Sequence, residues 1–189
     1  MISHLNISKA TPADIDGVLD LQRKYLVSNL TLPAQKDGFV TTPFTIEQIE
    51  QVMLEDGLFI AKHENEVVAY IFAGSWAYFN QWPIFPLMTK RFANLTFKNT
   101  SISVHNSFQY GPICIDKAYR GTGLLNKIFE YMRLNLQPKY PISITFINKI
   151  NGRSIKAHTE KLKWATIDEF EFNGNHFLML AFDMNISVL

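Results

Sequence analysis

A long β-type run that passes through a glycine turn into an amphipathic helix is the feature that most constrains this sequence. The run is Phe108–Ile115, and the turn is Arg120-Gly-Thr-Gly123. Apolar residues recur at helical spacing after the turn, in a helix that ends before Pro138. They are Leu124, Leu125, Ile128, Phe129 and Met132. A strand that leads through a tight turn into a helix favours a fold in which helices pack against a sheet.

The other β-type runs mix hairpins with strand–helix units. The expected strands are Leu5–Lys9, Leu58–Lys62, Val67–Gly74, Ser101–Val104, Ile142–Ile147, Ala165–Phe172 and Asn175–Met184. Asn173-Gly174 between two alternating runs predicts a tight hairpin. Helices are expected at about 12–29, from the capping box at Thr45, at about 85–95 and at about 153–162. The class is therefore α/β or α+β, with one domain over residues 1–189.

Composition narrows the range of functions. Hydrophobic residues make up 47% and charged residues 19%, which is typical of a globular protein and excludes disorder. A formal net charge of +1 argues against nucleic-acid binding through bulk charge. The sequence has one cysteine, no metal-ligand spacing, no apolar run of about 20 residues and no signal segment. We expect a cytoplasmic protein without a metal and with no nucleic-acid or membrane partner.

The glycine turn has the chemistry of an anion site. The N–H groups at a helix start and the helix dipole attract anions, and Gly121 and Gly123 let the backbone approach a phosphate. Arg120 adds a cation beside the same turn. The P-loop pattern and the three-glycine dinucleotide pattern are both incomplete here. A plain glycine turn that closes a strand–helix unit is the alternative.

Two segments carry a resemblance to a known family. Ile115–Leu125 resembles the acyl-CoA pyrophosphate segment of the GCN5-related N-acetyltransferases, where Arg120 and Gly123 match fixed positions and Gly121 a common one. Leu125 departs from the small residue expected at its place. The Asn-x-x-Ser-x-x-x-His run Asn151–His158 looks like the family's second cofactor segment.

The resemblance implies a fold and a co-substrate. The fold is a mixed, mostly antiparallel sheet of about seven strands with about four flanking helices. Strands four and five, Phe108–Ile115 and Ile142–Ile147, would splay to hold acyl-CoA. The co-substrate is acetyl-CoA, and the residues expected to bind it are Ile113, Cys114, Ile115, Arg120, Gly121, Thr122, Gly123, Leu124, Leu125, Asn151, Ser154 and His158.

The implied activity is transfer of the acetyl group to a primary amine of a small molecule or peptide by direct attack. The catalytic candidates are His158, as proton donor to the thiolate, and the strand residues Gln109 and Tyr110. Gln109 stands where the family often has a carboxylate, and it cannot act as a base. A covalent route through Cys114 is less favoured than direct attack. The alternative function is a catalytically weak acyl-CoA-binding module that acts as a sensor or regulator.

An aromatic-rich insertion at about 75–107 interrupts the resemblance. Trp76, Trp82 and Phe85 are its candidates for contact with the acceptor substrate. The same density of rings suits a satellite core or a subunit interface, so these readings stay open at this point. The chain is expected to be a monomer or a homodimer.

Overall fold

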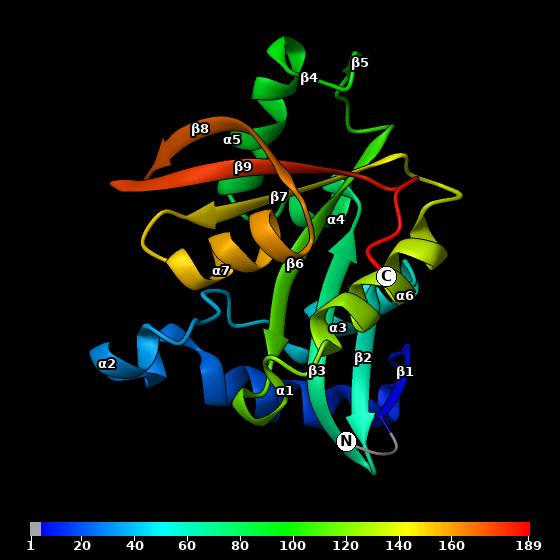
Figure 1. Ribbon diagram of the computed structural model, residues 1–189, viewed down its shortest axis with the longest axis vertical. Coiled ribbons are helices and arrows are strands. Elements are labelled where there is room, and N and C mark those ends of the chain that lie inside the picture. The colour runs from blue at the N-terminus through cyan, green and yellow to red at the C-terminus, as the bar shows by residue number, and fades with distance from the viewer. Residues whose placement is uncertain (1–4) are drawn as a thin grey trace. The chain divides into compact units, whose positions relative to one another are not determined.

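The computed structural model describes residues 5–189, and its main feature is a seven-stranded mixed sheet in the order β1-β2-β3-β6-β7-β9-β8 (Figure 1). The strands are β1 (Leu5–Lys9), β2 (Leu58–His63), β3 (Glu66–Gly74), β6 (Ser107–Ile115), β7 (Ile142–Asn148), β8 (Ala165–Phe172) and β9 (Asn175–Asp183). The pairs β1–β2, β2–β3, β7–β9 and β8–β9 are antiparallel, whereas β6–β7 is parallel. The predicted fold class is confirmed.

The chain divides into two compact units. Unit 1 comprises residues up to 73, residues 111–132 and Leu189, and unit 2 comprises Gly74–Tyr110 and Arg133–Val188. The helices are α1 (Ile15–Tyr25), α2 (Leu32–Gln35), α3 (Ile46–Leu54), α4 (Trp76–Phe79), α5 (Ile84–Arg91), α6 (Leu124–Leu136) and α7 (Gly152–Lys156). Within residues 5–189, none of them is both long and apolar enough to cross a membrane. The single domain expected from the sequence stays a prediction.

Helix α1 of unit 1 is shorter than the sequence predicts. The expected helix at 12–29 breaks into a 3₁₀ turn at Pro12–Asp14, α1, and a second 3₁₀ turn at Val27–Asn29. Leu26 between them is extended and forms a parallel β-bridge with Val40. The helix ends there because the backbone of Tyr25 and Val27 bonds to Val40 instead of continuing the helical ladder.

A buried amide ties the following loop to α1. The side chain of Gln22 donates to the carbonyl of Phe44 at 3.1 Å and accepts from its N–H at 2.9 Å. Both polar groups of the amide are thus satisfied inside the core. Phe44 then stacks on Phe72 of β3, with ring centroids 4.2 Å apart. The next residue, Thr45, begins α3 with the predicted capping box.

Unit 2 is organised around the hairpin of β8 and β9. Asn173 and Gly174 both have positive φ, at 49° and 71°, as a two-residue type I′ turn requires. The hairpin predicted from this dipeptide is confirmed. β9 also pairs with β7 along its length, so both of its edges are paired, and its residues Met179–Phe182 are buried.

The aromatic insertion holds α4, α5 and a separate small sheet of β4 (Thr96–Phe97) and β5 (Thr100–Ser101). The strand expected at 101–104 is wrong beyond Ser101. Ser103 donates its N–H to Asn106 Oδ1, and its hydroxyl accepts from the N–H groups of His105 and Asn106. Local side-chain bonds of this kind favour a turn over a strand.

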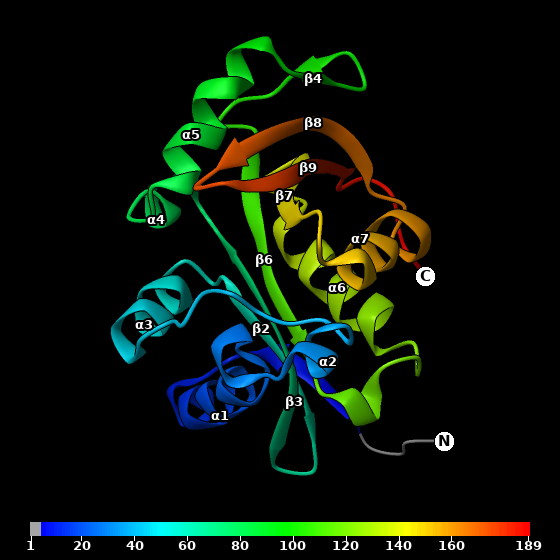
Figure 2. The same ribbon diagram turned by 90° about the vertical axis from the view of Figure 1, so that its left-hand side faces the viewer.

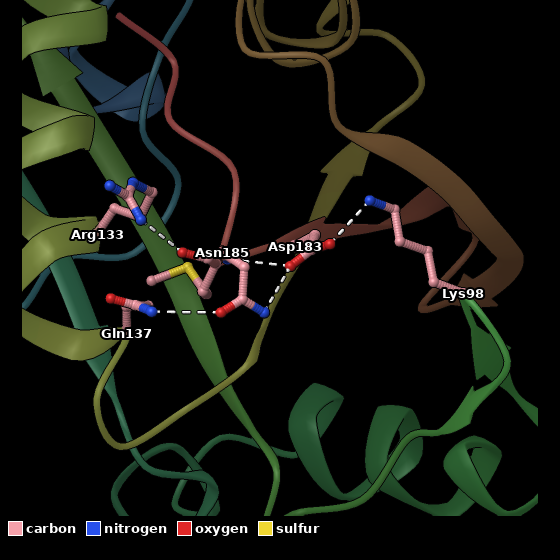
Figure 3. Close-up of polar contacts among 6 residues, drawn as sticks. Lys98, Arg133, Gln137, Asp183 and Asn185 are labelled. Carbon is pink, nitrogen blue, oxygen red and sulfur yellow. Dashed lines mark hydrogen bonds and ion pairs between the residues drawn. The ribbon is translucent and has the colours of Figure 1, made fainter.

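A polar network fixes the end of the chain within unit 2 (Figure 3). Arg133 donates to the carbonyl of Met184 at 2.6 Å, and Gln137 donates to Asn185 at 3.2 Å. Asn185 in turn donates to Asp183, which forms an ion pair with Lys98 at 2.8 Å. The segment after β9 is therefore anchored to the second half of α6.

A close approach at Gly57 gives a test of the unit 1 core. An added Cβ there would lie 2.0 Å from the carbonyl oxygen of Ala73 and 2.9 Å from a methyl group of Val52. We expect Gly57→Ala to lower the free energy of unfolding by about 2–3 kcal/mol, because the backbone must shift. Thermal unfolding should show a Tm lower by roughly 5–10 °C.

Gly152→Ala is the matched control, since a Cβ at Gly152 meets nothing within 4 Å and the residue begins α7. Its Tm should stay level or rise slightly. Equal Tm values for the two variants would contradict the packing described for Gly57.

Candidate functional site

The glycine turn of unit 1 has the geometry that an anion needs. Gly121 and Gly123 both take left-handed backbone conformations, with φ of 82° and 85°, and a Cβ built on either meets nothing within 4 Å. Helix α6 begins at Leu124, so the N–H groups of its first turn lack acceptors within the helix. An open glycine backbone beside the N-terminus of a 13-residue helix fits a phosphate.

Side chains of α1 and the loop after it hold the segment that precedes the glycines. Lys24 forms an ion pair with Asp116 at 2.6 Å, and the Tyr25 hydroxyl accepts from the N–H of Lys117 at 2.7 Å. Lys117 also reaches Asp37 at 2.6 Å. These bonds join parts of the sequence about 80–90 residues apart, so the turn is held by tertiary contacts.

Arg120 has a structural position in this turn. Its guanidinium donates to the carbonyl oxygens of Ile115 and Asp37 and lies over the ring of Tyr25, 4.7 Å from the centroid. The sequence predicts a cation directed at the phosphate. The structure shows a cation beside the turn that also fastens it. Thr122, another predicted ligand, donates its hydroxyl to the carbonyl of Tyr119.

Three residues that the sequence predicts to bind the co-substrate lie at the end of β6. Ile113 and Ile115 are half-buried, and Cys114 between them is buried. Burial raises the pKa of the Cys114 thiol to about 12, so the thiolate is scarcely present at neutral pH. This position does not favour the covalent route, because the thiolate is the nucleophile.

The contact between β6 and β7 is short. Parallel pairing runs from Ser107↔Ile142 to Gln109↔Ile144, whereas β7 pairs with β9 as far as Asn148. Pro112 lies farther along β6 and has no N–H to give to a ladder. A proline inside a β-type run was the sequence signal for a strand edge at this point.

Three rings meet in unit 2 around a predicted catalytic residue. The ring centroid of His158 lies 5.5 Å from that of Tyr110 and 5.8 Å from that of Trp164, and the last two are 5.0 Å apart. His158 lies in a π-helical turn, Ala157–Lys161, that replaces the end of the expected helix at 153–162. π-turns often occur at functional sites, and the sequence pattern did not indicate one.

His158 is neutral in the folded protein. Burial lowers its pKa to about 4, and its Nδ1 bonds to the carbonyl of Ser154 at 2.7 Å. A carbonyl accepts, so Nδ1 carries the proton and Nε2 is left with a lone pair. Nε2 is buried and has no hydrogen-bond partner among residues 5–189. At pH 7 this atom can therefore accept a proton but has none to donate.

Gln109 and Tyr110 are adjacent on β6 and point to opposite faces of the sheet. The Gln109 amide is 2% exposed and donates to the carbonyl of Tyr110 at 2.7 Å. Its Oε1 accepts nothing from the described residues, although it is buried. A buried acceptor without a donor is uncommon and is satisfied when a ligand brings an N–H or O–H.

The remaining predicted site residues have structural contacts. Asn151 caps α7 by accepting from the N–H of Ser154 at 3.2 Å. Trp76 donates to Ser107 and packs edge-on against Phe92. Trp82 and Phe85, the other two candidates for contact with the acceptor, lie in a cluster with Phe79. Trp76 and Phe85 are at most 7% exposed and lie in a core, whereas Trp82 is half-buried, and contact of these rings with the acceptor stays a prediction.

The described residues contain no group of three or more His, Cys, Asp or Glu side chains arranged to hold a metal ion. The candidate residues therefore fall into two groups, each described within its own unit. Unit 1 holds the glycine turn, and unit 2 holds the ring cluster with Gln109.

Solved structures share this architecture. An N-acetyltransferase from Staphylococcus aureus Mu50 matches 96% of this chain and 99% of its own, with a TM-score of 0.63 at 16% identity. The protein yncA from Salmonella typhimurium, solved with its cofactor acetyl-CoA, matches 95% of this chain and 94% of its own, with a TM-score of 0.63 at 14% identity.

A third match has a named protein substrate. The ribosomal-protein-S18-alanine N-acetyltransferase from Escherichia coli covers 97% of this chain and 96% of its own, with a TM-score of 0.62 at 11% identity. No family model and no curated protein matches the sequence. At these identities the likeness establishes the fold, which is that of the GCN5-related N-acetyltransferases.

The buried neutral His158 predicts how stability depends on pH. In the unfolded chain its pKa is about 6.5, so the unfolded state takes up a proton between pH 7 and pH 5 that the folded state does not. This residue should therefore lower the free energy of unfolding by about 2 kcal/mol over that interval. Urea unfolding of the protein and of His158→Gln at both pH values measures it.

The difference in stability between pH 7 and pH 5 should be smaller in His158→Gln by that amount. An equal difference in both proteins would mean that His158 is not held neutral by the fold.

Proposed function

We propose that this chain, which has the fold of an N-acetyltransferase, moves the acetyl group of acetyl-CoA to a primary amine of a small molecule or peptide by direct attack. The observation that carries the proposal is the open turn at Gly121 and Gly123, which stands at the start of α6 in a fold that binds acetyl-CoA in a solved neighbour. The bound co-substrate supplies a thioester carbonyl that an amine can attack.

The residues of unit 1 fit the pyrophosphate of this molecule. The two glycines leave space for the pyrophosphate where side chains would block its approach. The first N–H groups of α6 attract its negative charge. Arg120 contributes a permanent positive charge beside them while it holds the turn.

The residues of unit 2 fit the reacting end. Gln109 Oε1 is a buried acceptor on one face of β6, and the Gln109 amide donates to the carbonyl of Tyr110, so it supports the strand from which Tyr110 projects. Tyr110 is on the opposite face of the strand, and burial raises the pKa of its hydroxyl above the ordinary value. It therefore keeps its proton at neutral pH and can donate a hydrogen bond to the leaving sulfur.

His158 has a different part in this proposal from the one the sequence suggested. With a pKa of about 4 it has no proton on Nε2 at pH 7, so we assign the donor role to Tyr110. His158 packs against the Tyr110 ring and positions it. The loss of the amine proton then falls to water, since Gln109 is not a base.

Binding of acetyl-CoA gives the first test. At a concentration about 100 times its Kd, acetyl-CoA should stabilise the folded protein by about 2.7 kcal/mol and raise the Tm by roughly 5–10 °C. Gly123→Val should abolish this rise, because its side chain would fill the open turn. Thermal unfolding across a range of acetyl-CoA concentrations measures both.

Gly174→Val is the matched control, because Gly174 also has positive φ and open space but lies in the β8–β9 turn. It should lower the Tm through backbone strain and keep the full rise with acetyl-CoA. No rise in the unmodified protein at millimolar acetyl-CoA would refute the co-substrate assignment.

Removal of the Tyr110 hydroxyl tests the chemistry. Tyr110→Phe should lower kcat by about 10²-fold, in the usual range for the loss of one hydrogen-bond donor to developing negative charge, and should leave the Kd for acetyl-CoA nearly unchanged. Release of free CoA thiol in the presence of an amine library measures turnover. Tyr140→Phe removes the same atom from a ring that packs on Phe108, and its kcat should be unaltered.

Other outcomes identify other mechanisms. A rate that survives Tyr110→Phe but falls in His158→Ala, with an apparent pKa that disappears, would return the donor role to His158. Binding of acetyl-CoA without amine-dependent release of CoA would instead support the acyl-CoA-binding sensor.

A further inference from the structure

A groove in unit 2 lies between α5 and β8. We call it the α5–β8 groove, and its volume is about 620 Å³. α5 lies next to the end of β8 in both views of the fold (Figure 2). Binding sites for small molecules usually measure about 300–1,000 Å³. The groove is therefore large enough to take a small molecule.

The walls of the groove are mainly apolar. Helical spacing brings one side of α5 and the 3₁₀ turn after it (Phe92–Asn94) onto the groove, opposite the end of β8. The apolar side chains that line it are Pro83, Pro86, Leu87, Leu95 and Phe172. Such a lining favours a ligand with an apolar body.

One ion pair forms a polar part of the lining and is already satisfied. Arg91 binds both carboxylate oxygens of Asp168, at 2.5 and 3.0 Å, and donates to the carbonyl of Glu169 at 3.1 Å. Asp168 also accepts from the N–H of Glu169. These bonds occupy the backbone groups of edge strand β8 at Glu169, so an extended peptide cannot add to the sheet there.

Two further polar groups are available to a ligand. The Lys90 ammonium and the Asn94 amide are four residues apart on the same helical face, and both line the groove. Neither side chain makes a hydrogen bond or ion pair with the residues that the structure describes. Since Arg91 and Asp168 neutralise each other, the lining has one net positive charge, which belongs to Lys90.

We propose that the α5–β8 groove binds a small molecule with an apolar body and one carboxylate. The apolar body would lie against Leu87 and Phe172, and the carboxylate would accept from Lys90 and Asn94. This site is separate from Gln109 and Tyr110, because β7 and β9 stand between β6 and β8 in the sheet. At about 4.8 Å per strand, β8 is roughly 14 Å from β6. The proposal does not depend on acetyl transfer.

A set of three probes with one skeleton tests the charge requirement: 3-phenylpropionate, 3-phenyl-1-propanol and 3-phenylpropylamine. Each is titrated into the ¹⁵N-labelled full-length protein, and the amide shifts are followed by NMR. The acid should bind saturably, with the largest shifts on α5 and on β8 near Phe172. The alcohol should bind about 10-fold more weakly than the acid, and the amine more weakly still.

Two substitutions locate the site. Lys90→Gln should weaken 3-phenylpropionate about 10-fold without affecting the fold, because Lys90 is exposed. Lys156→Gln removes the same charge from an exposed position on α7 and should leave the Kd unchanged. Leu87→Ser should weaken all three probes alike.

Three results would each overturn the proposal. They are equal affinity for the acid and the alcohol, shifts centred outside α5 and β8, and an unchanged Kd in Lys90→Gln. The last result does not depend on Leu87→Ser, so poor folding of that variant would leave the conclusion intact.

Discussion

The attachment of one backbone turn to helix α1 is the constraint on which the candidate phosphate site depends. Two glycines in left-handed conformations, Gly121 and Gly123, make this turn flexible, and alone it would sample many conformations. Lys24, Tyr25 and Asp37 bind the segment from Asp116 to Arg120 through ion pairs, a hydroxyl and backbone carbonyls. Most of these groups are partly exposed, so each bond contributes little by itself. Together they hold the backbone N–H groups of the glycine turn next to the N–H groups at the start of α6.

The same arrangement explains why Arg120 matters even though its side chain is engaged. An arginine that only reached for a ligand would lose conformational entropy on binding, whereas this one is already ordered by two carbonyls and a ring. Its charge is retained, because a guanidinium stays protonated in proteins. An ordered positive charge beside an open backbone loses less conformational entropy on ligand binding than a flexible one.

In unit 2 burial sets the chemistry. Removal from water lowers the pKa of His158 and raises that of Tyr110, so both groups are neutral over the physiological range. A single strand presents Gln109 to one face and Tyr110 to the other, because successive side chains alternate. An acceptor and a donor are thus offered on opposite sides of β6 by two neighbouring residues. Gln109 Oε1 and His158 Nε2 are buried and have no hydrogen-bond partner among residues 5–189.

The sequence by itself determined the features that local chemistry controls. Asn173-Gly174 specifies its hairpin because few residues tolerate two positive φ values, and Thr45 with Gln48 specifies the start of α3 because both caps lie within one turn. The glycine turn after β6 was identifiable for the same reason. The tertiary structure alone decided the end of α1 at Leu26, the π-turn at His158 and the placement of Trp76 in a core. Each of these depends on a partner distant in the chain or on burial, and neither is encoded in the spacing of neighbouring residues.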